Sequence, residues 1–323
     1  MQGEDARAEP ARGRRRRERV TDPPGQEGAD MDRTIVVGLD TSAGSAAAMA
    51  WALDLVAGTG TRVVPVHAWQ YPALCLLPFP AGLPVPPPEA MQDDAEARAG
   101  RLVAGICPPD GGVVGVDVAE PAVREGSAAR VLCTEADRSR ADLVVVGSRG
   151  LSGVRSALAG SVSAGCAHRA PTAVAIVPAD SGEKTQHGVA VVGVDGSDAS
   201  MAAVEFADRW MPEDSLLLLV HAWNLPVTMS GMVAMSDLDA IEAAAEELLA
   251  TAAETVEHHK VDTVVRRGDP RTELDQLAET ADAVVLGRTG HNVAERFLLG
   301  SVANHAVHHV ATPTIIVPAP ETD

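Results

Sequence analysis

The chain has 323 residues, 46% of them hydrophobic, and 45 acidic residues against 26 Lys and Arg give it a formal net charge of −19. This length suits two domains of about 150 residues, each with its own core. The acidic balance argues against a nucleic-acid partner, because phosphate backbones are bound by basic surfaces, and no apolar run approaches the roughly 20 residues that a membrane span needs.

The N-terminal segment is rich in Arg, acidic residues, Gly and Pro. Because such a composition buries too little apolar surface to order the backbone, we expect residues 1–31 to form a disordered tail. This tail lacks the apolar segment of a secretory signal peptide. The four cysteines, Cys75, Cys107, Cys133 and Cys166, show no paired spacing, as is typical of reduced thiols. Together these features predict a cytoplasmic protein.

After this tail, one sequence unit occurs twice. TIVVGLDTSAGS at 34–45 matches VAVVGVDGSDAS at 189–200, and RVVPVHAW at 62–69 matches LLLLVHAW at 216–223. Two further matches follow in the same order, so the chain is a tandem duplication. The predicted organisation is a first domain over 32–178, a linker over 179–187 and a second domain over 188–319.

Each unit alternates short apolar runs with Ala-rich stretches of helical period. Runs such as Ile35-Val36-Val37 and Val144-Val145-Val146 are apolar without interruption, which is typical of strands buried on both faces of a parallel sheet. The stretches 46–55 and 240–256 are long enough for right-handed crossover helices. We therefore predict an α/β fold with two tandem, doubly wound, Rossmann-like layers of about five parallel strands, with helices on both faces.

The two units differ in length after the second strand. His67 and Gly147 lie 80 residues apart, whereas His221 and Gly287 lie 66 residues apart. The additional residues fall in the proline-rich stretch 72–90, which we predict to be a surface loop because proline disfavours helices and central strands.

In both halves an apolar strand leads into a glycine loop. Glycines allow positive φ and a close approach of a ligand to the backbone. A serine that caps the next helix would leave N–H groups and the helix dipole to attract an anion. The pattern therefore predicts a phosphate cradle at the carboxyl edge of each sheet. Two glycines three positions apart are followed, after nine residues, by a Gly-Ser pair: Gly147, Gly150 and Gly160-Ser161 in the first copy, and Gly287, Gly290 and Gly300-Ser301 in the second.

Two other phosphate motifs are absent. Neither copy contains the G-x-x-x-x-G-K-[ST] sequence of a P-loop. The dinucleotide fingerprint needs its glycines at the first strand-to-helix turn, where Asp40-Thr41-Ser42 stands instead. For one copy, a tight turn with a helix cap would explain the glycines equally well. Two copies with the same spacing and different filler favour a phosphate site.

These residues resemble those of the universal stress protein family, in its tandem two-domain form, over about 34–178 and 189–318. The resemblance rests on the Asp that ends the first strand, the His-Ala pair of the second strand, and the G-x-x-G-(nine)-G-S signature. This signature marks the ATP-binding branch of the family. The resemblance implies a fold similar to the adenine nucleotide alpha hydrolases, and ATP, with or without Mg²⁺, as the ligand.

The resemblance also implies the residues of each site. The proline-rich loop would lie near the first adenine, as a lid or as an obstacle, and Thr41 departs from the more usual glycine but can still cap a helix. Near the adenosine the implied contacts are Asp40, Thr41 and Ala68 in the first unit and Asp195, Gly196 and Ala222 in the second. Around the ribose and phosphates they are Gly147, Gly150, Gly160, Ser161 and Val162 in the first and Gly287, Gly290, Gly300, Ser301 and Val302 in the second.

Arginines in or beside the glycine loops are candidates for phosphate contact. Arg149 and Arg288 follow the strands closely, and Arg155 and Arg296 lie further along the loops. A solvated surface arginine is the simpler interpretation, but a cation must offset phosphate charge in so acidic a protein. We therefore include Arg149 and Arg288 in the predicted sites, with Mg²⁺ as a further source of positive charge.

The histidines do not indicate catalysis or a metal site. His67 and His221 precede Ala-Trp in the second strands, and we predict core-edge side chains with satisfied hydrogen bonds. His258-His259 and His308-His309 are expected on helices, where adjacent residues point to different faces and cannot share a metal.

The sequence contains no paired-carboxylate motif, nucleophile elbow or zinc spacing. We therefore expect an ATP-binding regulatory protein that hydrolyses ATP slowly at most. The alternatives are an enzyme that transfers adenylate or phosphate on the same fold, and a protein-interaction module without nucleotide. The resemblance further implies an intramolecular pseudo-dimer, joined through the last strands in 172–178 and 312–318, and a homodimer of two chains.

Overall fold

The computed structural model describes residues 33–71, 87–107, 113–149, 160–181, 188–224, 235–290 and 298–320. The prediction for the tail 1–31 lies outside these ranges, as do most of the linker 179–187 and most of the stretch 72–90. Three residues named in the sequence analysis, Gly150, Arg155 and Arg296, also lie outside them.

Strands and helices alternate in both halves, as the apolar pattern predicts, except that the first half has two successive strands, 117–118 and 122–125, where the second half has one. The elements of the first half are β1 (Thr34–Gly38), α1 (Ala43–Leu55), β2 (Arg62–Trp69), α2 (Pro88–Ile106), β3 (Asp117–Val118), β4 (Ala122–Glu125), α3 (Ala128–Ser139), β5 (Leu143–Gly147), α4 (Ser161–Arg169) and β6 (Ala173–Val177). Those of the second half are β7 (Val189–Gly193), α5 (Asp198–Trp210), β8 (Leu216–Trp223), α6 (Met235–Ala253), β9 (Lys260–Arg267), α7 (Pro270–Ala278), β10 (Ala283–Gly287), α8 (Ser301–His309) and β11 (Thr314–Val317).

One helix begins earlier than the sequence predicts. Helix α2 starts at Pro88, inside the stretch 72–90 that was expected to be a loop. Proline is compatible with the first helical position, because the N–H there has no intrahelical acceptor and φ is already helical. The loop prediction is therefore wrong for residues 88–90, and residues 72–86 lie outside the described part of the chain.

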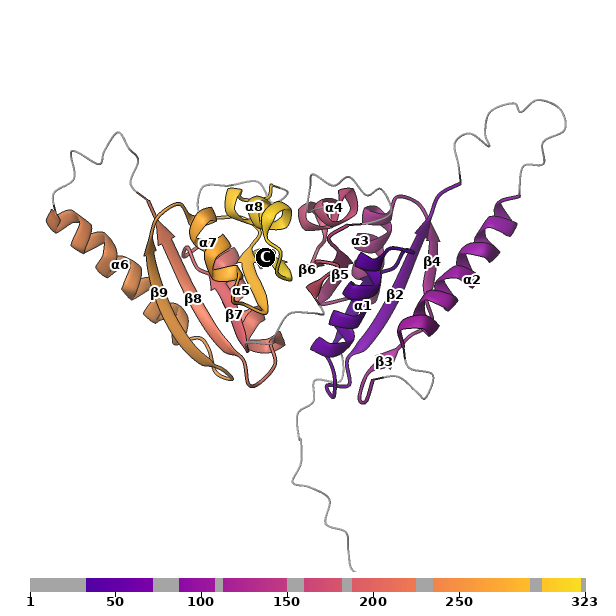
Figure 1. Ribbon diagram of the computed structural model, residues 1–323, viewed down its shortest axis with the longest axis horizontal. Helices are drawn as coiled ribbons and strands as arrows, with labels where there is room; N and C mark the ends of the chain where they lie inside the picture. Colours follow the sequence, from indigo (N-terminus) through magenta and orange to yellow (C-terminus); the bar gives the residue numbers. More distant parts are fainter. Residues whose placement is uncertain are drawn as a thin grey trace, which may run out of the picture.

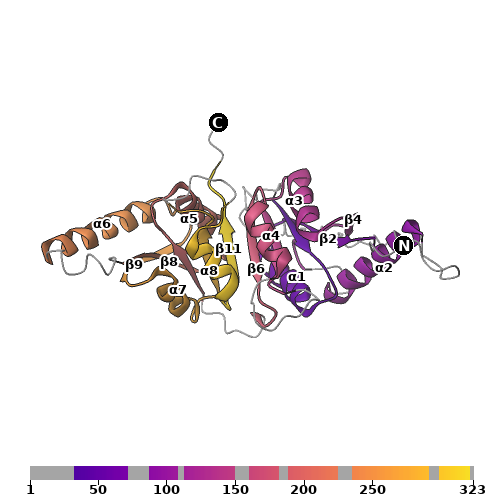
Figure 2. The same cartoon turned by 90° about the horizontal axis from the view of Figure 1, so that it is seen from above.

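The strands of both halves form one sheet of eleven strands, in the order β3-β2-β1-β5-β6-β11-β10-β7-β8-β9 (Figure 1). Strand β4 also pairs with β2, beyond β3, so β3 and β4 share one position in the sheet. The described pairs are parallel except β6 with β11, which run antiparallel and place Ala175 opposite Ile315. The mostly parallel, doubly wound fold is thus confirmed, and the last strands join the two layers edge to edge (Figure 2).

Two apolar cores cover the two faces of this sheet. Ile35 and Val37 belong to one core and Val36 to the other, because successive strand residues point to opposite faces. Helices α1, α2, α5 and α6 pack on the first face, and α3, α4, α7 and α8 on the second. The paired Ala175 and Ile315 are both fully buried in the first core, so the junction between the halves is itself part of the core.

Two arginines reach across this junction in opposite directions. Arg288 of the second half donates a hydrogen bond to the carbonyl of Ala170 at 2.6 Å. Arg33 of the first half donates to the carbonyl of Arg209 at 3.1 Å, and its guanidinium lies 5.1 Å from the ring centre of Trp210. With the β6–β11 pairing, these contacts pack the two halves as the pseudo-dimer that the repeat predicts.

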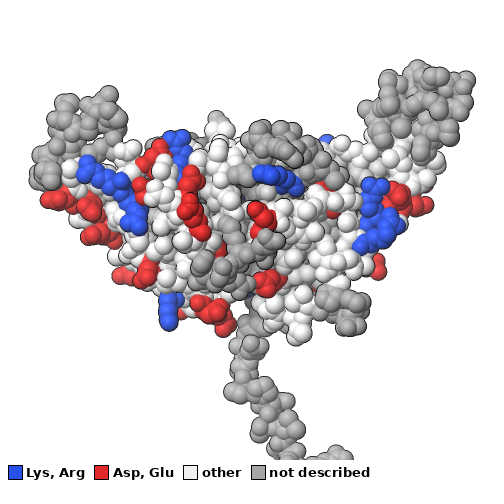
Figure 3. Space-filling view, viewed as in Figure 1, with Lys and Arg blue, Asp and Glu red and all other residues white. Residues whose placement is uncertain are grey.

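The surface carries charges of both signs. On the face shown in Figure 3, Lys and Arg lie in small groups between Asp and Glu over the described residues. None of the described helices combines the length and the apolar composition that crossing a membrane requires.

Candidate functional site

In each half an aspartate follows the first strand by two residues and closes a turn on a serine. In the first half, Asp40 Oδ1 accepts hydrogen bonds from the backbone N–H of Ser42 at 2.8 Å and from the Ser42 hydroxyl. In the second half, Asp195 Oδ1 accepts the same two bonds from Ser197, at 3.0 and 2.5 Å. Each carboxylate is thereby paired and held in place by its own turn, as a charged group at the end of a buried strand requires.

The serine of each turn also caps the following helix. Ser42 Oγ accepts the N–H three residues further on at 3.2 Å, and Ser197 Oγ does the same at 3.3 Å. The expectation that Thr41 caps the helix is therefore wrong. Its counterpart Gly196 has a φ of +82°, a left-handed conformation that Thr41 does not share.

Gly147 and Gly287 end the strands that lead into the glycine loops. A Cβ atom on Gly147 would lie 2.6 Å from the backbone of Gly44, and one on Gly287 would lie 2.7 Å from the backbone of Ala199. Gly44 and Ala199 are the second residues of α1 and α5. Close packing of helix on strand therefore already requires glycine at these two positions.

The expectation that the loop glycines have positive φ is wrong for those that the structure describes. Gly147, Gly287, Gly290 and Gly300 all lie outside the left-handed region. At Gly290 the requirement is again space, because a Cβ there would lie 2.5 Å from Asp195 Oδ2.

One backbone hydrogen bond closes each glycine loop at its base. The N–H of Gly160 donates to the carbonyl of Ser148 at 2.6 Å, and the N–H of Gly300 donates to the carbonyl of Arg288 at 2.8 Å. These are equivalent positions in the two copies. The start of α4 is therefore held beside the end of β5, and the start of α8 beside the end of β10.

Helices α4 and α8 begin without a side-chain cap. Gly160 and Gly300 occupy the N-cap positions, and Ser161 and Ser301 are the first helical residues. The expectation that these serines cap the helices is therefore wrong. Because no described side chain accepts from them, the N–H groups of the first turn remain donors for an anion, assisted by the helix dipole.

A cavity of about 290 Å³ lies at this edge of the first half. Thr41 is not among its lining residues. The sequence interpretation missed the apolar wall from β2 and α3, which includes Val66, Ala128 and Leu132, and also the hydroxyls of Ser42 and Ser45. The predicted residues that line the cavity are Asp40, Ala68, Gly147, Arg149, Gly160, Ser161 and Val162.

The second half has a smaller cavity, of about 200 Å³, at the equivalent edge. Thr289 and Glu273 line it without having been predicted, and Glu273 Oε2 lies 3.9 Å from Arg266 Nε. Four predicted residues line this cavity, namely Asp195, Ala222, Gly287 and Val302. Four others, Gly196, Gly290, Gly300 and Ser301, lie beside it without lining it.

Arg288 does not face the second cavity. Its side chain is buried and bonds to the carbonyl of Ala170 in the other half, and this burial lowers its pKa. The prediction that Arg288 contacts a phosphate is therefore wrong. Its register in the loop explains this, since Arg288 corresponds to the buried Ser148, whereas the exposed Arg149 corresponds to Thr289.

The strand histidines lie where the sequence predicts. His67 Nδ1 is 2.8 Å from the carbonyl oxygen of Leu39, and His221 Nδ1 is 2.7 Å from that of Val194. Each ring therefore ties the second strand to the residue before the aspartate turn, a structural role.

His258 and His259 differ from the prediction. They precede β9 and do not lie on a helix, and both contact the carboxylate of Asp208, at 2.9 and 3.1 Å. Within the described ranges no group of three His, Cys, Asp or Glu is arranged to hold a metal ion.

Comparison with known proteins places this repeated architecture in a family. The sequence model of the universal stress protein family matches residues 31–178 and again 188–318. The chain belongs to the universal stress protein family. Both matches include an aspartate turn, a His-Ala strand and a closed glycine loop.

This universal stress protein has relatives of similar length. It is 30% identical over 292 residues to a universal stress protein of Mycobacterium tuberculosis, covering 87% of this chain and 96% of the relative. It is likewise 30% identical over 293 residues to one of Mycolicibacterium smegmatis, covering 88% and 96%. The crystal structure of a universal stress protein from Archaeoglobus fulgidus matches with a TM-score of 0.63 at 16% identity, covering 90% of this chain and 99% of that one, which shows a common fold.

Proposed function

We propose that this protein binds ATP in the two edge cavities and acts as a nucleotide-dependent regulator. The observation that supports this most is repetition. The aspartate turn, the strand-end alanine and the loop closed at its base recur at the same place in both halves, although the residues between them differ. A purely structural role would not require an open cavity to be kept in both copies.

The first cavity fits the parts of an adenine nucleotide. Val66, Ala128 and Leu132 form an apolar wall that suits a flat base. The first turn of α4, with its uncapped N–H groups, suits phosphate oxygens. Arg149 is exposed at the same cavity and can offset phosphate charge.

Mg²⁺ would accompany the triphosphate and offset more of its charge. Asp40 lines the first cavity and Asp195 the second, and carboxylate oxygens suit Mg²⁺ and ribose hydroxyls alike. Because the described residues offer no cluster able to hold an ion by protein ligands alone, Mg²⁺ would be bound largely through the phosphates.

In this proposal ATP acts by occupying the cavity, with slow hydrolysis at most. Helices α4 and α8 would sense occupancy, because their first turns would contact the phosphates directly. The cytoplasmic location and the homodimer stay predictions from the sequence.

Aspartates introduced at the two helix starts test the proposal. The variant Ser161→Asp with Ser301→Asp places a carboxylate where phosphate would bind, but an acidic first turn suits the helix itself, so the fold should persist. We expect ATP to bind at least about tenfold more weakly, measured by isothermal titration with Mg²⁺. Thr251→Asp on α6 adds one negative charge away from both cavities and should leave the affinity unchanged; each single variant, Ser161→Asp or Ser301→Asp, is its charge-matched counterpart.

The wild-type protein should retain ATP, up to two per chain, when its native mass is measured. Unchanged affinity in the double variant would contradict the cradle. Turnover beyond about one equivalent per site would favour the transferring enzyme, and a wild-type protein that binds no nucleotide would favour the interaction module. Either result would overturn the proposal.

A further inference from the structure

Two cysteines of the first half meet where helices α3 and α4 pack together. Cys133 lies on α3 and is partly exposed, whereas Cys166 lies on α4 and is fully buried. Both belong to the apolar core on this face of the sheet. Their thiols interact with each other, and the interaction shifts the two pKa values in opposite directions.

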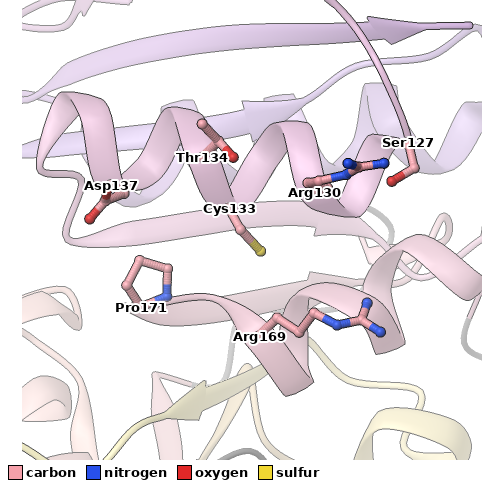
Figure 4. Close-up of a pocket in the computed structure, with 7 residues that line it drawn as sticks. All are labelled: Ser127, Arg130, Cys133, Thr134, Asp137, Arg169 and Pro171. Carbon is pink, nitrogen blue, oxygen red and sulfur yellow. The ribbon is translucent and has the colours of Figure 1, made fainter.

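Cys133 also borders open space. A cavity of about 580 Å³ lies between the two helices, on the surface beside Cys133. Figure 4 shows the Cys133 sulfur directed from α3 toward α4, with the guanidinium groups of Arg130 and Arg169 at the same end of the cavity. A small solute can therefore reach Cys133 but not Cys166.

The groups around this pair lower the pKa of the Cys133 thiol and raise that of the Cys166 thiol. The hydrogen bond from Cys166 lowers the pKa of Cys133 most, and Arg288 and Arg169 lower it further, against the effect of burial. The pKa of Cys166 is raised by its hydrogen bond to Cys133 and by burial. The other charged groups at the cavity are Arg130 and Asp137, both on α3.

The second half shows that the fold does not need thiols here. When α3 and α7 are aligned on the glycine before each helix, Asp275 occupies the position of Cys133. When α4 and α8 are aligned in the same way, Ala306 occupies the position of Cys166. Asp275 instead bonds to His305 Nε2 at 3.0 Å. The same two helices therefore pack with or without a cysteine pair.

We propose that Cys133 and Cys166 form a dithiol site that hydrogen peroxide oxidises to a disulfide between α3 and α4. The Cys133 thiolate attacks one peroxide oxygen, the O–O bond breaks, and the hydroxide that leaves takes up a proton to become water. Cys166 sulfur then attacks the Cys133 sulfenic acid. The S–S bond forms as the S–O bond breaks, and the departing hydroxide leaves as water with the Cys166 proton. The two thiols lose two electrons, and the peroxide gains them.

The arrangement assigns a distinct role to each cysteine. Cys133 reacts first because it is partly exposed and lies near positively charged arginines, the two features that make a thiol reactive. Cys166 resolves the sulfenic acid because its thiol is the one that interacts with Cys133. Cys107 serves as an internal reference, since burial raises the pKa of its thiol.

The test uses the full chain and hydrogen peroxide at one equivalent, followed by alkylation and peptide mapping by mass spectrometry. We expect the peptides of Cys133 and Cys166 to be linked and Cys107 to remain alkylated. Before oxidation, Cys133 should react with iodoacetamide at least severalfold faster than Cys107 at pH 7. An unlinked pair, a link between two chains, or equal alkylation rates would each overturn the proposal.

Two variants separate chemistry from folding. Cys166→Ala copies the second half and should fold; dimedone should then trap the sulfenic acid at Cys133. Arg169 is exposed at the end of α4. The variant Arg169→Gln should therefore slow the reaction with peroxide severalfold without changing the circular dichroism spectrum. Absence of the dimedone adduct in folded Cys166→Ala, or an unchanged rate in Arg169→Gln, would contradict the assigned roles.

Discussion

The cavity of the first half is about 290 Å³ and has Arg149 on its wall, whereas that of the second half is about 200 Å³ and has Thr289 at the equivalent position, with Glu273 nearby. The backbone bonds that build the two sites are nevertheless the same, residue for residue. The duplication has thus kept the frame of the site and changed its charge. The two halves should therefore bind a polyanion with different affinities, although their backbone structures are similar.

The shared frame predicts the largest effect. Gly147→Ala places a methyl group 2.6 Å from helix backbone, and Gly287→Ala places one 2.7 Å from it. Because backbone atoms cannot swing aside, each change should lower the free energy of unfolding by about 2–3 kcal/mol, measured in urea. Gly100→Ala on α2 is the control, since nothing lies within 4 Å of its Cβ, and it should stabilise the helix by about 0.5–1 kcal/mol. Very different losses at the two glycines would break the equivalence of the halves.

The changed charge predicts the next effect, and it rests on the proposed ATP sites. Arg149→Thr gives the first cavity the residue of the second, and Thr289→Arg does the reverse. We expect the first change to raise the Kd of the first site about tenfold and the second to lower that of the second site, because a charge-assisted hydrogen bond to phosphate is lost or gained. Titration of single-site proteins carrying Ser161→Asp or Ser301→Asp resolves the two sites.

Arg101→Thr removes the same charge from an exposed position on α2 and controls for net charge. If it weakens ATP binding as much as Arg149→Thr does, the effect is long-range and the difference between the cavities is not the cause.

A smaller difference concerns pH. Asp208 stands in the second half where the first has Leu53. Burial opposes its ionisation, but hydrogen bonds from the N–H of Glu257 and from His258 outweigh this and lower its pKa. The hydrogen bond to Asp208 in turn raises the pKa of His258.

The sign of each contribution follows from these shifts. The raised pKa of His258 stabilises the folded state below the unfolded value of about 6.5, and this contribution is lost as pH rises through the folded value. The lowered pKa of Asp208 stabilises the folded state above about pH 4, the unfolded pKa of an aspartate. This contribution is lost as the pH falls further, through the folded pKa. Urea midpoints should therefore fall slightly from pH 5.5 to 8.5. His258→Gln should flatten that fall, and an unchanged slope would contradict this origin.

Much of the fold follows from local patterns. Uninterrupted runs such as Ile35-Val36-Val37 are typical of strands covered on both faces, and the repeat then places the second half by analogy. The start of α2 was missed because proline disfavours a helix interior but not its first position. Leu216–Trp223 was predicted as a strand, and is one, for the same reason as β1.

The sequence predicted where the site lies, but not why particular residues are needed there. The glycine spacing located both loops, yet Gly147 and Gly287 are explained by helix backbone that lies far away in sequence. Arg288 was misassigned because being in a loop says nothing about which way a side chain points. Val66 could have been found, since it lies two positions before Ala68 and so shares its strand face.

Among the described strands, the pairing of β6 with β11 leaves β9 at one end of the sheet and the β3–β4 position at the other. Strand β9 carries Lys260, Arg266 and Arg267, and Pro121 interrupts the opposite edge between β3 and β4. Charged or interrupted edges resist the addition of further strands. The addition of further strands at either end of the sheet is therefore disfavoured.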